Sequence, residues 1–171
     1  AYAEVIREFG HPVLFRLFNE MNGDWCPYSA YNTSRDTQIF CEAYRYIYSI
    51  FEESGANENT LWVWNPNSVS YPNFDWNHAL MYYPGDEYVD IIGMTAYNTG
   101  TYYSGEKWQS FGELYDAMYR SYCEWFTQPF MITEFASSSV GGDKAAWMTD
   151  MFSKIKSYGK VRLAVWWDGC D

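Results

Sequence analysis

The sequence predicts an α/β fold with a parallel sheet and favours a (β/α)8 TIM barrel. Short apolar runs alternate along the chain with longer segments of helical periodicity, rather than occurring in blocks of one kind. The predicted strands are apolar along their whole length, which is typical of parallel strands covered by helices. A doubly wound sheet is the alternative, but no Gly-rich phosphate-binding loop follows any predicted strand. The barrel is therefore the better interpretation.

Each element follows from local patterns. Proline or glycine marks several ends: Gly55 and Gly159 end helices, Pro66 ends a strand, and Pro129 separates a helix from the next strand. Residues 1–9 are interpreted as the end of an earlier helix. The predicted strands are 12–20, 60–65, 89–97, 130–136 and 161–167, and the predicted helices are 35–54, 109–126 and 143–157. The buried face of the first of these helices is predicted to carry Ile39, Tyr46, Ile47 and Ile50.

The number of strands is smaller than a barrel requires. A barrel has eight strands and typically about 250 residues, whereas five strands are predicted in these 171 residues. Five strands alone would leave two apolar sheet edges exposed. We therefore expect residues 1–171 to be one partial catalytic domain that supplies about strands 4 to 8, with the first three strands missing.

Composition narrows the classes of partner. The net charge is −11, from 22 acidic against 11 basic residues, which argues against nucleic acid or an anionic membrane surface. No apolar run approaches the roughly 18 residues of a membrane helix. Aromatic residues make up 22% of the chain and include nine tryptophans, more than a core of this size usually needs. Exposed aromatic rings are what proteins use to stack on sugars.

The cysteines and histidines do not form a metal-binding pattern. Cys26, Cys41, Cys123 and Cys170 are far apart in the sequence, with no CxxC pair, and there are only two histidines. Zinc ligands usually occur in closely spaced pairs. We expect four buried thiols, no metal and no cofactor.

Polar and aromatic residues follow the predicted strands, at the ends that form the active face of a barrel. Two of them, Glu20 and Glu134, are carboxylates 114 positions apart. Hydrolysis of sugar polymers needs such a pair, one to protonate the leaving oxygen and one to attack or to activate water. Glu134 has apolar neighbours in FMITEFA, which an ordinary solvated glutamate does not explain. Trp64 and Trp167 also end strands and are candidate substrate-binding residues.

Five segments together resemble glycoside hydrolase family 26 in order and spacing. The resemblance implies a (β/α)8 barrel and retaining chemistry, with Glu20 as acid/base at the end of strand four and Glu134 as nucleophile at the end of strand seven. The first strand of this chain would then be strand four of the barrel. The segments are PVLFRLFNEMNGDW (12–25), LWVWNPN (61–67), YYPGDEYVDIIGMTAYN (82–98), MITEFA (131–136) and AVWWD (164–168).

The resemblance also implies roles for three aromatic residues. Trp25 resembles an aromatic platform beyond the cleavage point, and Trp167 resembles the ring beneath the sugar whose bond is cut. Tyr97 would donate a hydrogen bond to the nucleophile and hold it ionised.

The predicted strands also indicate the surroundings of two residues near these candidates. Trp166 should point away from Trp167 and pack against helices, because side chains alternate along a strand. Arg16 lies four residues before Glu20 and is expected to pair with carboxylates, because a buried unpaired charge is costly.

Two positions depart from the mannan-degrading members of the family. Asn19 stands where these members usually have His, and Thr95 stands where they usually have Asp; both were expected to contact the sugar. Related barrels that act on glucans and xylans use Asn-Glu at the first position. The sequence therefore favours a β-1,4-glucan or mixed-linkage β-1,3-1,4-glucan over mannan, with xylan third.

Two classes of protein other than an endo-acting enzyme remain open. One is a carbohydrate-binding relative without catalysis, which would need neither the glutamate pair nor Tyr97. The other is a structural domain whose aromatic residues are all core. For an enzyme of this family the expected partner is a plant-type β-glycan polysaccharide. A secreted location is expected because such polymers lie outside cells.

Overall fold

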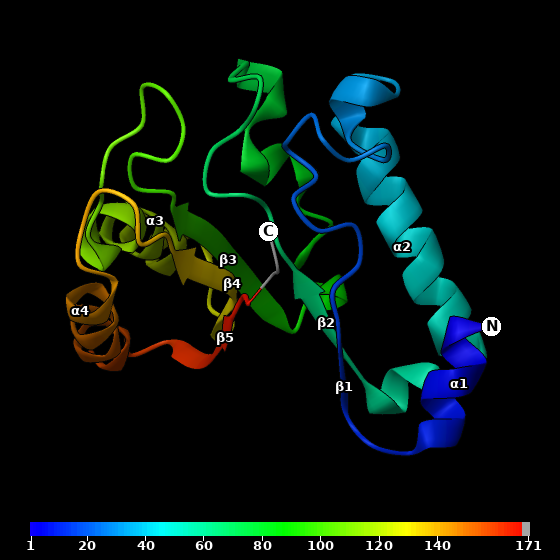
Figure 1. Cartoon of the computed structure of the whole chain (residues 1–171). Coiled ribbons are helices and arrows are strands. Elements are labelled where there is room, and N and C mark those ends of the chain that lie inside the picture. The colour runs from blue at the N-terminus through cyan, green and yellow to red at the C-terminus, as the bar shows by residue number, and fades with distance from the viewer. Residues whose placement is uncertain (169–171) are drawn as a thin grey trace. The chain divides into compact units, whose positions relative to one another are not determined.

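The computed structural model describes residues 1–168, in which strands and helices alternate along the chain (Figure 1). Strand β1 pairs with β2, β2 with β3 and β4 with β5, in each case in parallel. The strands follow one another in the sheet in chain order, so the predicted α/β class with a parallel sheet is confirmed. The elements are α1 (Tyr2–Phe9), β1 (Val13–Phe15), α2 (Thr37–Glu53), β2 (Thr60–Trp64), β3 (Ile91–Asn98), α3 (Phe111–Trp125), β4 (Phe130–Ser137), α4 (Lys144–Ser157) and β5 (Val161–Trp166).

The chain forms two compact units, Ala1–Gly93 (the N-terminal unit) and Met94–Asp171 (the C-terminal unit). Strand β3 crosses the boundary between them. The assignment to barrel strands 4 to 8 and the single partial domain stay predictions. No helix in the described part of the chain is long and apolar enough to span a membrane.

The first predicted strand is much shorter than expected. Only Val13–Phe15 pairs with β2, and residues 17–20 form turns. Phe18 and Glu20 have φ angles of 51° and 56°, in the left-handed region that a continuing strand cannot contain. Glu20 therefore lies on a turn beyond the strand and not at its last position.

Helix α2 begins and ends at polar and glycine signals. The Asp36 carboxylate accepts a hydrogen bond from the amide of Gln38 at 2.9 Å, which satisfies one of the unpaired amides of the first turn. Gly55, just after the helix, has a φ of 75°, which glycine adopts at little cost. The predicted boundaries 35–54 are thus close to the observed Thr37–Glu53.

The buried face of α2 was predicted wrongly. Ile39 and Tyr46 are 53% and 68% exposed, and Ile50 is exposed as well. Phe40, Tyr44 and Phe51 are buried instead, and the rings of Tyr44 and Phe51 lie 5.5 and 4.9 Å from that of Trp62. Aromatic rings bury more area than isoleucine side chains, so the face that carries three of them turns to the core.

In the C-terminal unit, β4 contains a bulge at the candidate nucleophile. Ile132 pairs with Ala164 and Phe135 with Trp166. Two residues of β4 (133 and 134) therefore stand opposite one residue of β5 (165). A bulge re-aims a side chain and ends regular pairing, and here it contains Glu134.

Trp166 packs as predicted. Its ring lies 6.3 Å from that of Trp147 on α4 and 5.3 Å from that of Phe135. The prediction that it faces helices is confirmed.

The strands also have an uncovered apolar face. Leu14 and Leu61 are register partners in β1 and β2 and are 40% and 39% exposed. Leu163 and Val165 of β5 are similarly exposed.

The three cysteines of the described chain are free thiols, of which Cys41 is buried. Cys26 and Cys123 are only half-buried, which corrects the expectation of buried thiols, and Cys170 lies outside the described residues.

Candidate active site

Glu20 lies in the N-terminal unit with both carboxylate oxygens engaged. The side-chain amide of Asn67 donates to Oε1 at 2.8 Å, and the indole N–H of Trp25 donates to Oε2 at 3.0 Å. Glu20 is half-buried, and Trp25 is 50% exposed. Trp25 therefore combines a hydrogen bond to the carboxylate with an accessible ring.

The turn that carries Glu20 is attached to the end of β2. The amide of Glu20 donates to the carbonyl of Asn65 at 2.7 Å, and the amide of Gly23 donates to the carbonyl of Glu20 at 3.0 Å. Arg16 donates to the side-chain oxygen of Asn65 at 3.1 Å. This partner of Arg16 is an amide, and the expected pairing of Arg16 with carboxylates stays a prediction.

Asn19 is half-buried and is held by a tyrosine. The hydroxyl of Tyr28 lies 2.7 Å from the backbone oxygen of Asn19 and 3.2 Å from its side-chain oxygen. Burial raises the pKa of Tyr28 well above its usual range, so the hydroxyl is protonated at neutral pH and donates. Tyr28 therefore holds Asn19 in place, next to Glu20 in the chain.

Glu134 lies in the C-terminal unit, half-buried in the β4 bulge. The hydroxyl of Tyr97, on β3, donates a hydrogen bond to Oε2 of Glu134. The structure therefore brings together the two residues that the resemblance paired.

A second tyrosine supports this pair from behind. The hydroxyl of Tyr115 on α3 accepts a hydrogen bond from the amide of Ala96 at 2.9 Å. It also lies 3.0 Å from the carbonyl of Ala96 and 3.2 Å from that of Glu134, and donates its one hydrogen to either. Burial raises the pKa of Tyr115 far above its usual range, so this bridge between the strands is neutral. No sequence pattern marks Tyr115, because a tyrosine four residues after Phe111 is typical of any helix core.

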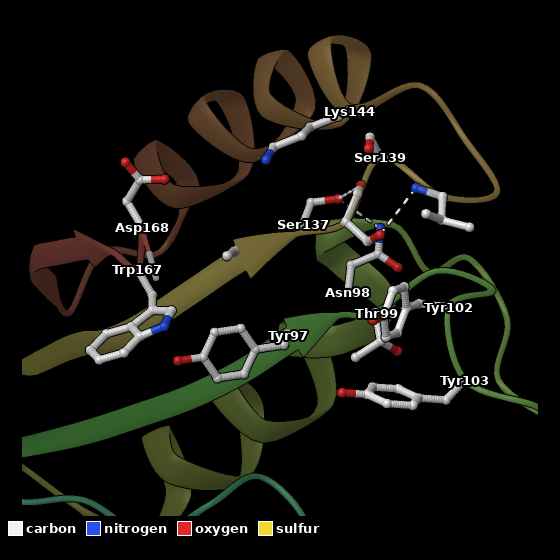
Figure 2. Close-up of a pocket in the computed structure, with 13 residues that line it drawn as sticks. Tyr97, Asn98, Thr99, Tyr102, Tyr103, Ser137, Ser139, Lys144, Trp167 and Asp168 are labelled. Atoms are coloured by element: carbon white, nitrogen blue, oxygen red, sulfur yellow. Dashed lines mark hydrogen bonds between the residues drawn. The ribbon is translucent and has the colours of Figure 1, made fainter. Parts of the chain in front are cut away.

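A cavity of about 560 Å³ lies beside Tyr97 in the C-terminal unit, and its lining is both aromatic and polar (Figure 2). Trp167, 52% exposed, and Tyr97 line one end, and Tyr102 and Tyr103 line the other. Its lining residues are Tyr97, Asn98, Thr99, Tyr102, Tyr103, Ala136, Ser137, Ser138, Ser139, Val140, Lys144, Trp167 and Asp168. Rings and hydroxyls together suit a sugar, which offers an apolar ring face and a rim of hydroxyls.

Asn98 joins the two loops that line this cavity. Its side-chain amide donates to the Ser137 hydroxyl at 2.9 Å, and its side-chain oxygen accepts from the amide of Gly100 at 3.2 Å. Gly100 has a φ of 64°, and a Cβ there would lie 2.0 Å from the carbonyl oxygen of Val140. Only glycine fits this close approach, so the cavity wall has a fixed shape.

Two residues expected at the substrate are in the core instead. Trp64 is completely buried, and its indole N–H donates to the carbonyl of Tyr82 at 3.0 Å. It shares a strand face with Trp62, which packs on α2. Thr95 is also completely buried, with its hydroxyl 2.8 Å from that of Thr133. Neither residue lines the cavity, so neither is placed to bind a sugar there.

Within residues 1–168, no group of three or more His, Cys, Asp or Glu side chains is placed to hold a metal ion. Each unit carries a half-buried glutamate, one beyond β1 and one in β4, with an aromatic side chain hydrogen-bonded to it. Glycoside hydrolysis needs such carboxylates, and the comparisons identify a glycoside hydrolase domain. The family model of glycosyl hydrolase family 26 matches residues 2–120, and the chain belongs to this family.

The curated relatives include an endoglucanase and several mannanases. Endoglucanase H of Acetivibrio thermocellus is 38% identical over 168 residues, which are 96% of this chain and 18% of that protein. A mannan endo-1,4-beta-mannosidase of Bacillus subtilis is 37% identical over 101 residues, 57% of this chain and 26% of that protein. The chain thus spans about a quarter or less of these relatives.

Solved structures agree with the fold. The catalytic domain of the GH26 endo-beta-1,4-mannanase of Bacillus sp. JAMB-750 superposes with a TM-score of 0.68 at 26% identity, over 91% of this chain and 41% of that one. An endo-beta-1,4-mannanase double mutant of Cellulomonas fimi gives a TM-score of 0.69 at 24% identity, over 94% and 36%. The latter likeness supports the fold alone.

Proposed function

We propose that the protein is a retaining endo-acting hydrolase of β-linked polysaccharides, with Glu20 as acid/base and Glu134 as nucleophile. The observation that carries the proposal is the Tyr97–Glu134 hydrogen bond beside a cavity lined by Trp167. A hydrogen bond from a neutral phenol fixes the rotation of the carboxylate and favours its charged form. A domain that only binds sugar has no need of either effect.

The reaction proceeds in two displacements. Glu134 attacks the anomeric carbon, and the glycosidic C–O bond breaks as Glu20 gives its proton to the leaving oxygen. Water then attacks the anomeric carbon of the glycosyl-enzyme, Glu20 takes the proton from the water, and Glu134 leaves as a carboxylate. The net change is hydrolysis with retention of configuration, and no group other than water is consumed.

Mannan is the first substrate to test. Mannanases recur among the relatives by sequence, and the similar structure at 26% identity is a mannanase as well. The preference for glucan rested partly on Thr95, which is buried, and the comparisons favour mannan over glucan.

A β-glucan is the second candidate. It is supported by Endoglucanase H, whose match covers 96% of this chain, although the matched part is 18% of that protein. Asn19 also supports it, as the residue beside Glu20. Xylan is third. Action on plant-type β-glycans outside the cell is part of the proposal.

One experiment tests reaction and substrate together. The full-length protein is incubated with mannan, mixed-linkage β-glucan and xylan, and new reducing ends are measured. Proton NMR of the first products from the best substrate then reports their anomeric configuration. Initial formation of the β-anomer supports retention, and initial formation of the α-anomer overturns it. Binding to any of the polymers without new reducing ends would instead indicate a non-catalytic relative.

A further inference from the structure

The side-chain amide of Asn67 lies 2.8 Å from Oε1 of Glu20, 47 positions away in the sequence. We propose that Asn67 is a positioning residue for the acid/base carboxyl: it fixes the rotation of Glu20 and keeps the catalytic proton off the lone pair that faces it. The inference rests on the proposed role of Glu20 and goes beyond it by assigning the residue that controls where the proton sits.

The amide of Asn67 can face Glu20 only with its nitrogen. Its oxygen accepts a hydrogen bond from the amide of Val69 at 3.1 Å and lies 3.5 Å from the hydroxyl of Ser68. An asparagine nitrogen donates and does not accept, so a proton on the facing lone pair of Glu20 would meet another hydrogen.

The other partner of Glu20 has the same restriction. The indole N–H of Trp25 also only donates, and it faces Oε2 at 3.0 Å. Because both of these hydrogen-bond partners are donors, the proton of the acid form occupies one of the lone pairs that face neither of them. Those are the lone pairs available to a glycosidic oxygen.

Asn67 is itself held rigidly. Its backbone amide donates to the side-chain oxygen of Asn22 at 2.8 Å, and the Asn22 side-chain nitrogen donates to the Asn67 carbonyl at 3.1 Å. Asn22 is 1% exposed, and its own carbonyl accepts from the side chain of Asn77 at 3.0 Å. A buried network in which the polar groups are paired favours a single arrangement. The side-chain amide of Asn67 is therefore held in one position relative to Glu20.

The position of the proton on the Glu20 carboxyl group matters in both displacements. The proton leaves Glu20 for the glycosidic oxygen in the first, and a proton from water returns to Glu20 in the second. A carboxyl that rotates freely would turn the protonated oxygen away from the bond for part of the time. Proton transfer by a placed side chain contributes about 10²–10⁴-fold, and misplacement forfeits part of that factor.

The test separates a loss of proton transfer from a general loss of activity or folding. In the full-length protein, Asn67→Ala is expected to lower kcat/KM on the best polysaccharide about ten- to a hundredfold, within the contribution of general acid catalysis. Hydrolysis of a 2,4-dinitrophenyl glycoside of the same sugar should fall less than about threefold, because that leaving group needs little protonation. Asn67→Leu keeps about the same size and removes the donor without adding a charge beside Glu20, and it should give the same selective loss if Asn67→Ala does not fold.

Asn57→Ala is the matched control. Asn57 is also an asparagine of the N-terminal unit that donates to a glutamate, Glu52, at 2.8 Å, and it accepts from Trp62 at 2.9 Å. Its loss should affect thermal stability and leave the ratio between the two substrates unchanged.

The results for the Asn67 variants and for Glu20→Ala together decide whether Asn67 positions the acid/base carboxyl group. Equal losses on both substrates, or no loss, in the Asn67 variants would overturn the inference. Glu20→Ala, measured in parallel, separates this failure from failure of the proposed function. If Glu20→Ala shows the selective loss and the Asn67 variants do not, only the role of Asn67 is wrong. If Glu20→Ala lacks it as well, the assignment of Glu20 falls, and the inference falls with it.

Discussion

The hydroxyl of Tyr115 accepts a hydrogen bond from the amide of Ala96 at 2.9 Å, one residue before Tyr97. The same hydroxyl reaches the carbonyl of Glu134 at 3.2 Å. One side chain of α3 thus joins the backbones that carry the proposed nucleophile and its hydrogen-bond donor. The spacing of β3 and β4 at the site therefore depends on a completely buried residue that does not line the cavity.

Replacement of Tyr115 by Phe should therefore lower turnover without weakening substrate binding. The ring keeps its stacking on Phe111 at 4.5 Å, but the buried amide of Ala96 loses its hydroxyl partner, at about 1–3 kcal/mol. We expect kcat to fall about tenfold or more, with KM within about twofold. Steady-state kinetics and a thermal melt of the full-length variant check this.

Tyr158→Phe is the control for that variant. Tyr158 is also buried in the C-terminal unit, and its hydroxyl donates to Asp116 at 2.6 Å. It should lose stability with kcat retained. A similar fall of kcat in both variants would show that Tyr115 acts only through stability.

The two carboxylates should fail in different ways. Glu134→Ala is expected to abolish turnover of every substrate, because no bond to the anomeric carbon can form. Glu20→Ala should lose about 10²–10⁴-fold on polysaccharide and far less on aryl glycosides with good leaving groups. Kinetics on both substrate types check the assignment, and a reversed pattern would exchange the roles. In a crystal structure the two carboxyl groups should lie about 5–5.5 Å apart, and a separation of about 6.5–9.5 Å would indicate inversion.

Asn19 tests the basis of substrate preference. If its amide binds the 2-hydroxyl of the reacting sugar, Asn19→Ala should cost about 1–3 kcal/mol, or roughly ten- to a hundredfold in kcat/KM. The loss should be much smaller on the matching 2-deoxy substrate. Tyr28→Phe removes only the brace on Asn19, so it should affect both substrates alike. Should Asn19→Ala also affect both alike, Asn19 is a brace and does not set specificity.

The expectation of missing strands predicts how the 171-residue chain behaves alone. Leu14 and Leu61 leave an apolar surface on β1 and β2, and exposed apolar strands promote association. The isolated chain should be molten or aggregate, as measured by thermal melting and light scattering. A sharp two-state melt of a monomer would contradict the prediction.

Local signals made most of the fold predictable. Helix α3 begins at a capping box formed by Ser110 and Glu113, and Pro129 precedes β4, so these boundaries agreed within about two residues, as expected of strong end signals. The turn at Glu20 was missed because it needs a left-handed residue that is not glycine, which no sequence pattern marks. The face of α2 was missed because periodicity alone does not rank aromatic against aliphatic residues.

The site was predictable only where a motif carried it. The strand-end pattern singled out Glu20, Glu134 and Trp167, and the resemblance added their roles. Tyr97 and Trp25 received roles only from the resemblance. Asn67 and Tyr115 act through contacts 47 and 19 positions apart, and neither residue type is unusual where it stands. Trp64 had the right position at a strand end but points to the core, which depends on strand register and not on the motif.

The left-handed backbone of Glu20 makes a prediction about descendants of this protein. With a φ of 56°, a residue with a Cβ costs about 1–2 kcal/mol that glycine avoids. Selection for stability alone would therefore favour loss of the carboxylate, and the proposed role of Glu20 in turnover would oppose that loss. A descendant that has given up hydrolysis and kept binding is expected to drift towards Gly, Asn or Asp at this position. The residue at this turn would then distinguish hydrolases from relatives that only bind sugar. The aromatic lining of the cavity would not, because both kinds of protein use it.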